Sequence, residues 1–445
     1  MTDTSQSGGV GEITHRRILH TALPIVLSNA TVPILGTVDT GVVGQMGEAA
    51  PIGAVGIGAV ILAGLYWIFG FLRMGTTGLT ARAKGEGRHG EVAAMLTRAV
   101  LIGVAAGLLL ILGQVWFFRA AFWLSPASPE VETLARQYLQ IRIWSAPAAI
   151  AIYGLTGWLI AQERTKAVLV IQLWMNGVNI LLDLWFVLGL GWGVEGVAIA
   201  TAFAEVTGCI LAVWLCRDVF QNPAWKEKAR VFDPLALREM AAVNGDILLR
   251  SLMLQAIFMS FLFLGADFGD DTLAANQVLL QFLYITAYAL DGFAFAVETL
   301  AGQAFGGKDR VGLRRATYMA SVWAVVGSVL IAVVYWIAGG WIVDLMTTSE
   351  TLRNLARVYL PWVVLSPLLG VAPFMLDGVF IGATQTKDMR NMMLLSTVIY
   401  FASLALLVPV WGNHGLWLAL MVSFVARGAT LAMRYPALEA RAAQQ

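Results

Sequence analysis

Apolar runs of about 20 residues recur along the whole sequence, and they constrain the fold more than any other feature. A run of this length crosses a bilayer as a helix, whereas a barrel strand is an alternating run of roughly 10 residues. Charged residues make up only 13% of the chain, against about 25% in soluble proteins. The sequence therefore predicts an all-α polytopic membrane protein. Its twelve expected transmembrane helices cover residues 18–46, 52–72, 93–117, 134–160, 167–190, 194–216, 240–265, 273–303, 316–340, 353–382, 391–410 and 415–434.

Basic residues gather in alternate loops and predict the orientation of these helices. Examples are Lys84, Lys166, Lys228, Lys308 and Lys387, which follow the second, fourth, sixth, eighth and tenth expected helices. Loops rich in Lys and Arg stay in the cytoplasm. We therefore expect both termini to be cytoplasmic, as a flexible N-terminus (1–17) and a short C-terminus (435–445). Membrane lipids surround the helices between them.

Two sequence repeats divide the chain into halves. The segment 80–92 (TARAKGEGRHGEV) resembles 302–313 (GQAFGGKDRVGL), and 155–166 (LTGWLIAQERTK) resembles 376–387 (LDGVFIGATQTK). Both pairs match at an offset of 221 residues, which places Ala83 opposite Ala304. A repeat of six helices predicts two homologous bundles around a central cavity. We expect an N-lobe (18–216), a cytoplasmic linker (217–239) and a C-lobe (240–434).

The first expected helix carries an isolated carboxylate, Asp39, after two prolines, Pro24 and Pro33. An ionisable residue at membrane depth is costly and is usually functional, and proline bends a membrane helix. A bendable helix with an acid suits an ion-coupled pump. The alternative is that Asp39 is an interfacial cap or turn residue near Gly41 and Gly44.

The expected helix 167–190 carries four polar residues at spacings of 4, 3 and 4: Gln172, Asn176, Asn179 and Asp183. These spacings place them on one helical face. Oxygen ligands beside an acid suit Na⁺ coordination or a proton relay, and Thr201 in the next helix could add a hydroxyl. The alternative is a seam of interhelical hydrogen bonds. We favour a cation site for Asn179 and Asp183, and leave both interpretations open for Gln172 and Asn176.

The C-lobe carries a second polar face and an arginine deep in a helix. Arg250 is the only basic residue that we place deep in an expected helix, and we expect it to pair with Asp291, Glu298 or Asp377. Such a cluster is either a structural ion-pair network or part of gating and coupling. The polar face, one side of the expected helix 273–303, consists of Gln277, Gln281, Tyr284, Tyr288, Asp291 and Glu298.

Other classes of protein are poorly supported. The sequence has no phosphate-binding Gly-Lys-Ser/Thr loop, no Ser/His/Asp grouping and no His or Cys pattern with metal-ligand spacing. The basic loops are explained by membrane topology, so nucleic acid is not an expected partner. We predict no enzymatic activity and no cofactor. The only bound metal that we expect is Na⁺, if Na⁺ rather than H⁺ is the coupling ion.

The pattern as a whole resembles the multidrug and toxic compound extrusion (MATE) family. The resemblance lies in PIVLSNATVPILGTVDTGVVGQMG (24–47), in NGVNILLDLWFV (176–187) and in ALDGFAFAVETLAGQAFGGKD (289–309), which is most similar to the DinF-like branch. It implies a bacterial inner-membrane antiporter that exports amphipathic organic cations in exchange for H⁺ or Na⁺. It also implies that Asp39 couples protonation to bending at Pro24, and that Asn179, Asp183 and Thr201 form an N-lobe cation site.

The sequence departs from the NorM branch of that family. The expected helix 240–265 has Ser260 at its middle and no carboxylate there, which shifts the expectation toward the N-lobe acids and H⁺ coupling. A flippase for lipid-linked intermediates or polysaccharides is the alternative function, although a single deep arginine argues against a phosphate-binding cavity. We expect small-molecule substrates and a functional monomer.

Overall fold

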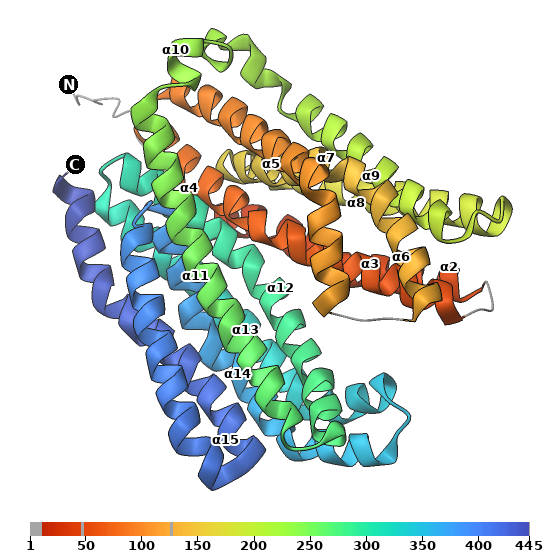
Figure 1. Cartoon of the computed structure of the whole chain (residues 1–445). Coiled ribbons are helices and arrows are strands. Elements are labelled where there is room, and N and C mark those ends of the chain that lie inside the picture. The colour runs from red at the N-terminus through yellow and green to blue at the C-terminus, as the bar shows by residue number, and fades with distance from the viewer. Residues whose placement is uncertain (1–10, 46–48, 125–127, 445) are drawn as a thin grey trace, which may run out of the picture. The chain divides into compact units, whose positions relative to one another are not determined.

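The computed structural model describes residues 11–45, 49–124 and 128–444, and every regular element in these ranges is a helix (Figure 1). Within them, the side chains of residues 34–37, 39, 40, 49, 124 and 444 are not described. The main helices are α1 (His15–Ala30), α2 (Val32–Gly44), α3 (Ala49–Trp67), α4 (Phe71–Gly85), α5 (His89–Leu124), α6 (Pro129–Arg142), α7 (Ala146–Ala161), α8 (Thr165–Asp183), α9 (Gly193–Leu215), α10 (Lys228–Val231), α11 (Pro234–Ala266), α12 (Asp270–Gly306), α13 (Arg310–Met346), α14 (Glu350–Gly382) and α15 (Thr386–Gln444).

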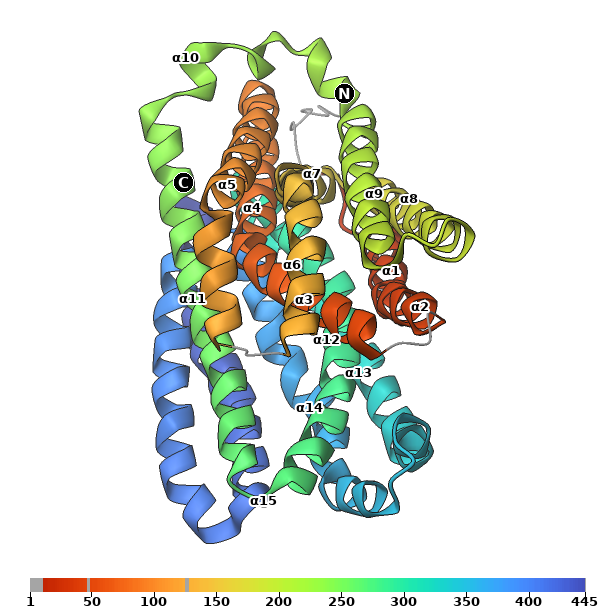
Figure 2. The same ribbon diagram turned by 45° about the vertical axis from the view of Figure 1, so that its right-hand side comes forward.

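The chain forms two compact units. Unit 1 comprises Met1–Val26, Ala81–Arg88 and Glu239–Gln445, and unit 2 comprises Leu27–Thr80 and His89–Arg238. In unit 2, α5 packs on α7, α8 on α9, and α3, α6 and α9 pack on one another. In unit 1, α12, α13, α14 and α15 lie side by side (Figure 2). The expected boundaries between lobes and linker remain a prediction.

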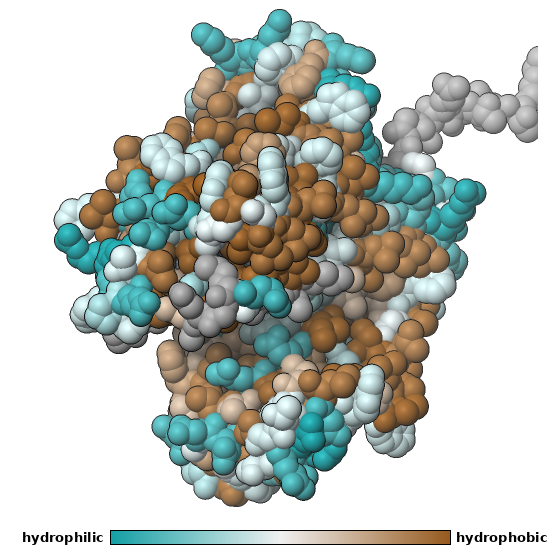
Figure 3. Space-filling view, turned by 90° about the vertical axis from the view of Figure 1, so that its right-hand side faces the viewer, coloured by the Kyte–Doolittle hydropathy of each residue, from teal (hydrophilic) through white to brown (hydrophobic). Residues whose placement is uncertain are grey.

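Ten helical segments of the described chain are long and apolar enough to span a membrane. Their outward side chains are largely apolar, for example Leu112 and Trp336, which are 80% and 78% exposed. One face of the molecule accordingly shows wide hydrophobic tracts between patches of hydrophilic residues (Figure 3). Exposed apolar surface on this scale is a liability in water and is covered by hydrocarbon in a bilayer.

Two expected helices differ from the observed ones because the backbone is interrupted. The segment 18–46 is not one helix: α1 ends at Ala30, and α2 starts again at Val32, directly before Pro33. Proline cannot donate a backbone hydrogen bond, and its ring clashes with the preceding turn. The segments 391–410 and 415–434 lie within α15, which turns sharply at Gly412 with a positive φ of 54°.

The sequence repeat reappears as a repeat of backbone turns. Gly87 and Lys308 have positive φ angles of 72° and 58°, and Glu163 and Thr384 have angles of 60° and 55°. Each pair is 221 residues apart. At each of the four turns an amide donates to the carbonyl five residues earlier, and all four hydrogen bonds are 2.9 Å long. This is the hydrogen bond of a Schellman helix end, and its recurrence at one offset explains why the sequences of these loops are alike.

The two copies of the first repeat also contact each other within unit 1. A Cβ atom at Gly306 would overlap the backbone carbonyl of Arg82, and a Cβ atom at Gly85 would overlap that of Gln303. The two contacts are reciprocal, because Gly85 and Gly306 are 221 residues apart and so are Arg82 and Gln303. Glycine is required at both positions since only a residue without a side chain lets these helix ends approach so closely.

We expect Gly306→Ala to destabilise the protein, by about 1–3 kcal/mol, because the added methyl group meets backbone rather than a movable side chain. Gly245→Ala is the matched control, since this glycine of α11 has open space around its Cβ position. Alanine is favoured over glycine in a helix by about 0.5–1 kcal/mol. Thermal unfolding of the purified protein, followed by tryptophan fluorescence, measures the difference. Equal midpoints for the two variants would contradict the close approach.

Candidate cation-coupling site

A buried amide and hydroxyl pair joins α8 to α9 in unit 2. The side-chain nitrogen of Asn179 donates a 2.9 Å hydrogen bond to the hydroxyl of Thr201. That hydroxyl donates in turn to the carbonyl of Val197, one turn earlier on α9, at 2.9 Å. Asn179 is 1% exposed. These two bonds fix the amide in one orientation, with its oxygen directed away from Thr201.

The oxygen of this amide is an unsatisfied acceptor. Asn179 Oδ1 is buried and accepts no hydrogen bond from any described residue. Asp183, one turn further along the same face of α8, is completely buried. A buried amide oxygen without a donor costs free energy unless a donor or cation comes to it. The carboxylate of Asp183, Asn179 Oδ1 and Thr201 Oγ1 are the oxygen types that hold Na⁺ or share a proton.

The other two polar residues on this face of α8 bind the break between α1 and α2. Gln172 donates to the side-chain oxygen of Asn176 at 3.0 Å, and Asn176 donates to the hydroxyl of Thr31 at 2.9 Å. Thr31 also donates to the carbonyl of Ser28 at 2.7 Å. This is an interhelical seam at the point where the first helix is interrupted. Thr31 was not predicted, although a threonine two residues before Pro33 in an apolar helix was a usable signal.

The predicted residues of the first helix lie on both sides of this break. Pro24 is inside α1, which continues through it as a helix, and Pro33 is in the first turn of α2. Asp39 belongs to α2, and this helix packs against α8 and α9. The side chain of Asp39 lies outside the described residues. In this conformation the backbone interruption is therefore at Thr31 rather than at Pro24.

A second buried charge cluster in unit 2 was not predicted. Arg142 of α6 forms a 2.7 Å ion pair with Glu205 of α9, and Ser145 donates a hydrogen bond to the same carboxylate. The arginine also donates to the hydroxyl of Tyr138 at 3.1 Å. Glu205 follows Thr201 by one turn, so a spacing of four between polar residues in an apolar helix was the signal available in the sequence.

The expectation that Arg250 is the only basic residue deep in a helix is wrong. Arg142 is 8% exposed, and Arg427 of α15 is 4% exposed. In unit 1, Arg250 pairs with Asp377, one of its three expected partners, and Arg427 pairs with the same carboxylate oxygen at 2.8 Å. One acid thus holds two guanidinium groups, because helices from three parts of the chain converge there. This convergence is invisible in the sequence.

The predicted polar face of α12 changes its surroundings along the helix. Gln277, Gln281 and Tyr284 are exposed, Tyr288 and Asp291 are half-buried, and Glu298 is 1% exposed. Glu298 lies where α12 contacts α14, since a Cβ atom at Gly382 would overlap its backbone carbonyl. The face is therefore a gradient from exposed to buried and not one uniform surface.

The sequence model of the MatE family matches residues 24–185 and 247–406. The chain belongs to this family. Each matched segment begins at an equivalent point of one half, which agrees with the repeat. Family members are membrane transporters, and their homologues include multidrug and toxic compound efflux proteins.

Individual relatives place the chain within the MatE family. It is 39% identical to DNA damage-inducible protein F of Escherichia coli over 94% of the chain and 91% of the relative. It is 24% identical to the "Probable multidrug resistance protein NorM" of Synechococcus over 94% of the chain and 93% of the relative. The resemblance to the MATE family is therefore confirmed, and its DinF-like character agrees with the higher of these identities.

Solved structures of MatE proteins have the same fold. The bent form of the Vibrio cholerae MATE transporter VcmN superposes with a TM-score of 0.87 at 20% identity, over 96% of this chain and 97% of that chain. A MOP superfamily transporter from Pyrococcus furiosus superposes with a TM-score of 0.85 at 16% identity, over 96% of both chains. The all-helical membrane fold is therefore confirmed.

We expect Arg142→Met to destabilise the protein by about 3–5 kcal/mol, because it leaves the carboxylate of Glu205 buried and charged without its partner. The double variant Arg142→Met/Glu205→Gln should regain at least half of this loss, since neither charge is then left alone. Thermal unfolding of the single and double variants checks this. A double variant no more stable than Arg142→Met would show that the two charges are not coupled.

The C-lobe cluster predicts an order of stabilities. Asp377→Asn leaves two buried guanidinium groups without an acid and should cost about 3–5 kcal/mol, whereas Arg427→Met leaves a neutral Arg250–Asp377 pair and should cost less. Arg357→Met serves as a control, because its partner Asp344 is partly exposed and such pairs contribute about 0–1 kcal/mol. Unfolding midpoints rank the variants, and Arg427→Met falling below Asp377→Asn would refute the shared-acid arrangement.

Proposed function

We propose that the chain is a secondary antiporter that exports amphipathic organic cations in exchange for H⁺ or Na⁺ by alternating access. The proposal includes twelve transmembrane helices in two homologous bundles around a central cavity, a bacterial inner-membrane location with cytoplasmic termini, and a functional monomer. Ten apolar spans support it, together with the turn in α15 and the interrupted first helix. So does membership of a transporter family.

The buried group around Asn179 carries the proposal. A charged carboxylate is expensive to keep in an apolar bundle, so Asp183 gains most from an incoming proton or cation. The vacant acceptor at Asn179 Oδ1 and the fixed hydroxyl of Thr201 are positioned to receive one. H⁺ would be shared between carboxyl and amide, whereas Na⁺ would be held by all three oxygens.

The movement that coupling requires has a natural place in the first helix. Asp39 is on α2, beyond the interruption at Thr31, and Asn176 of α8 binds that interruption. We propose that neutralising Asp39 and Asp183 changes how α2 packs on α8, and that α1 and α2 bend against each other at Pro24 or Thr31. Alternating access follows if this bending closes the N-lobe to the substrate.

The flippase alternative can no longer be set aside by counting arginines, since Arg142, Arg250 and Arg427 are all buried. Their pairing gives a better argument. Arg142 is bound by Glu205, and Asp377 binds the other two, so these guanidinium groups are already engaged by carboxylates. A phosphate-bearing lipid would have to displace those acids. An organic cation meets no such competition at the N-lobe oxygens.

We expect proteoliposomes with the wild-type protein to export a cationic dye such as ethidium when a pH gradient or a Na⁺ gradient is imposed. Asp183→Asn should reduce this export at least tenfold, because an amide neither binds a proton nor neutralises Na⁺. Asp344→Asn is the control, since this acid is partly exposed and pairs with Arg357. The gradient that drives export identifies the ion. A correctly inserted Asp183→Asn protein with full export would refute the coupling role, and a wild type that moves no cationic dye would refute the function.

A further inference from the structure

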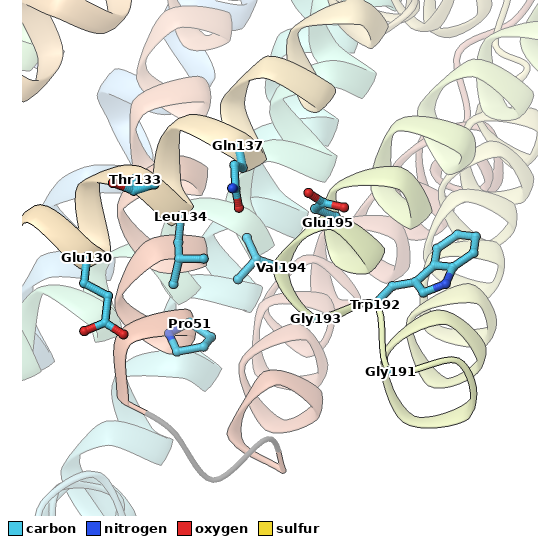
Figure 4. Close-up of a pocket in the computed structure, with 10 residues that line it drawn as sticks. All are labelled: Pro51, Glu130, Thr133, Leu134, Gln137, Gly191, Trp192, Gly193, Val194 and Glu195. Carbon is cyan, nitrogen blue, oxygen red and sulfur yellow. The ribbon is translucent and has the colours of Figure 1, made fainter.

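A separate cavity of about 520 Å³ opens at one end of unit 2, where α3, α6 and α9 begin (Figure 4). Its walls include Pro51 of α3, Leu134 of α6 and Val194 of α9, and the side chain of Gln137 is directed toward the same space. The volume is within the roughly 300–1,000 Å³ of small-molecule sites. Apolar walls with a single amide suit a ligand with an apolar body.

Two carboxylates give this cavity its charge. Glu130 of α6 and Glu195 of α9 line it, and neither forms an ion pair with any residue in the described ranges. No lysine, arginine or histidine is among the lining residues. The formal charge of the lining is therefore −2. A cation is attracted to this cavity and an anion of the same shape is repelled.

The helix dipole offers a simpler reason for these acids, and it is insufficient. Both lie in the first turn of a helix, where a negative charge is favourable. Glu132 occupies that same first turn of α6, but it pairs with Arg136 at 2.6 Å and does not line the cavity. The dipole therefore explains acids near both helix starts. It does not explain why two unpaired acids from different helices border one apolar cavity.

One wall of the cavity is rigid. Gly191 and Gly193 have positive φ angles of 68° and 60°, which turn the chain sharply between the end of α8 and the start of α9. Between them, Trp192 stacks on Phe186 with ring centroids 4.8 Å apart, and its amide donates to the Phe186 carbonyl at 2.9 Å. The indole points away from the cavity, so it buttresses the wall (Figure 4). A cavity held in this way needs little reordering to bind.

We propose that this cavity binds organic cations with an apolar body as a release-side site. The binding follows from the cavity itself, whereas the role rests on the proposed function and its orientation, which put the starts of α3, α6 and α9 on the non-cytoplasmic side. A cation leaving the transporter is held there by charge and apolar contact. It then dissociates into the medium, where salt weakens the attraction.

Protection of a cysteine tests the site locally in the full-length protein. Gln137→Cys is made in a Cys209→Ala/Cys216→Ala background, reconstituted in nanodiscs and treated with a membrane-impermeant, uncharged thiol reagent. Tetraphenylphosphonium should slow the labelling, and the near-isosteric anion tetraphenylborate should not. With Glu130→Gln/Glu195→Gln added, half-maximal protection should need about three- to tenfold more tetraphenylphosphonium. Glu132→Gln is the matched control and should leave that concentration unchanged.

Three results would overturn the site: no protection by tetraphenylphosphonium, equal protection by tetraphenylborate, or equal effects of the Glu132 and Glu130/Glu195 substitutions. The dye-export experiment fails independently of this one. Export by the wild type without protection of the cysteine introduced by Gln137→Cys would remove the site and leave the antiporter. Protection without gradient-driven export would leave the site and remove the antiporter.

Discussion

The cost of a charge inside an apolar helix bundle is the constraint on which this structure depends. The described chain meets it with two arrangements of ion pairs. Glu205 is bound by one arginine and a serine, and Asp377 is bound by two arginines. Around Asn179 the polar groups are neutral, an amide and a hydroxyl joined by one hydrogen bond. A carboxylate tied to arginine keeps its charge, because protonation would strand the buried cation. A group built on neutral oxygens can accept a positive charge without displacing one.

The internal repeat explains how such different interiors share one scaffold. The turns at Gly87 and Lys308, and those at Glu163 and Thr384, have the same handedness and the same hydrogen bond. These turns and the glycine contacts between α4 and α12 belong to helix ends, where backbone geometry leaves little freedom. The charged residues lie in helix interiors, where a side chain can change without altering the path of the chain. The halves therefore keep their architecture in common and differ in chemistry.

The sequence predicted what depends on local pattern and missed what depends on depth. Apolar run length indicated a helical membrane fold, and spacing along the 167–190 segment brought Asn179 toward a hydroxyl on the next helix. The Arg142–Glu205 pair was not anticipated, since a lone arginine near the start of a helix looks the same whether it faces solvent or a neighbouring acid. The break at Thr31 was misplaced for a related reason. Proline shows that a helix can be interrupted, but the packing of Asn176 fixes where.

The arrangement of α9 connects these features. Thr201 and Glu205 are one turn apart on this helix, so the hydroxyl that binds Asn179 and the carboxylate that binds Arg142 cannot move independently. The ion pair fastens α9 to α6, and the hydrogen bond fastens α9 to α8. A change in charge at the α8 side therefore acts on a helix already anchored on its other side. Under that restraint, the element left to respond is the interrupted first helix, where α2 contacts both α8 and α9 and bears Asp39.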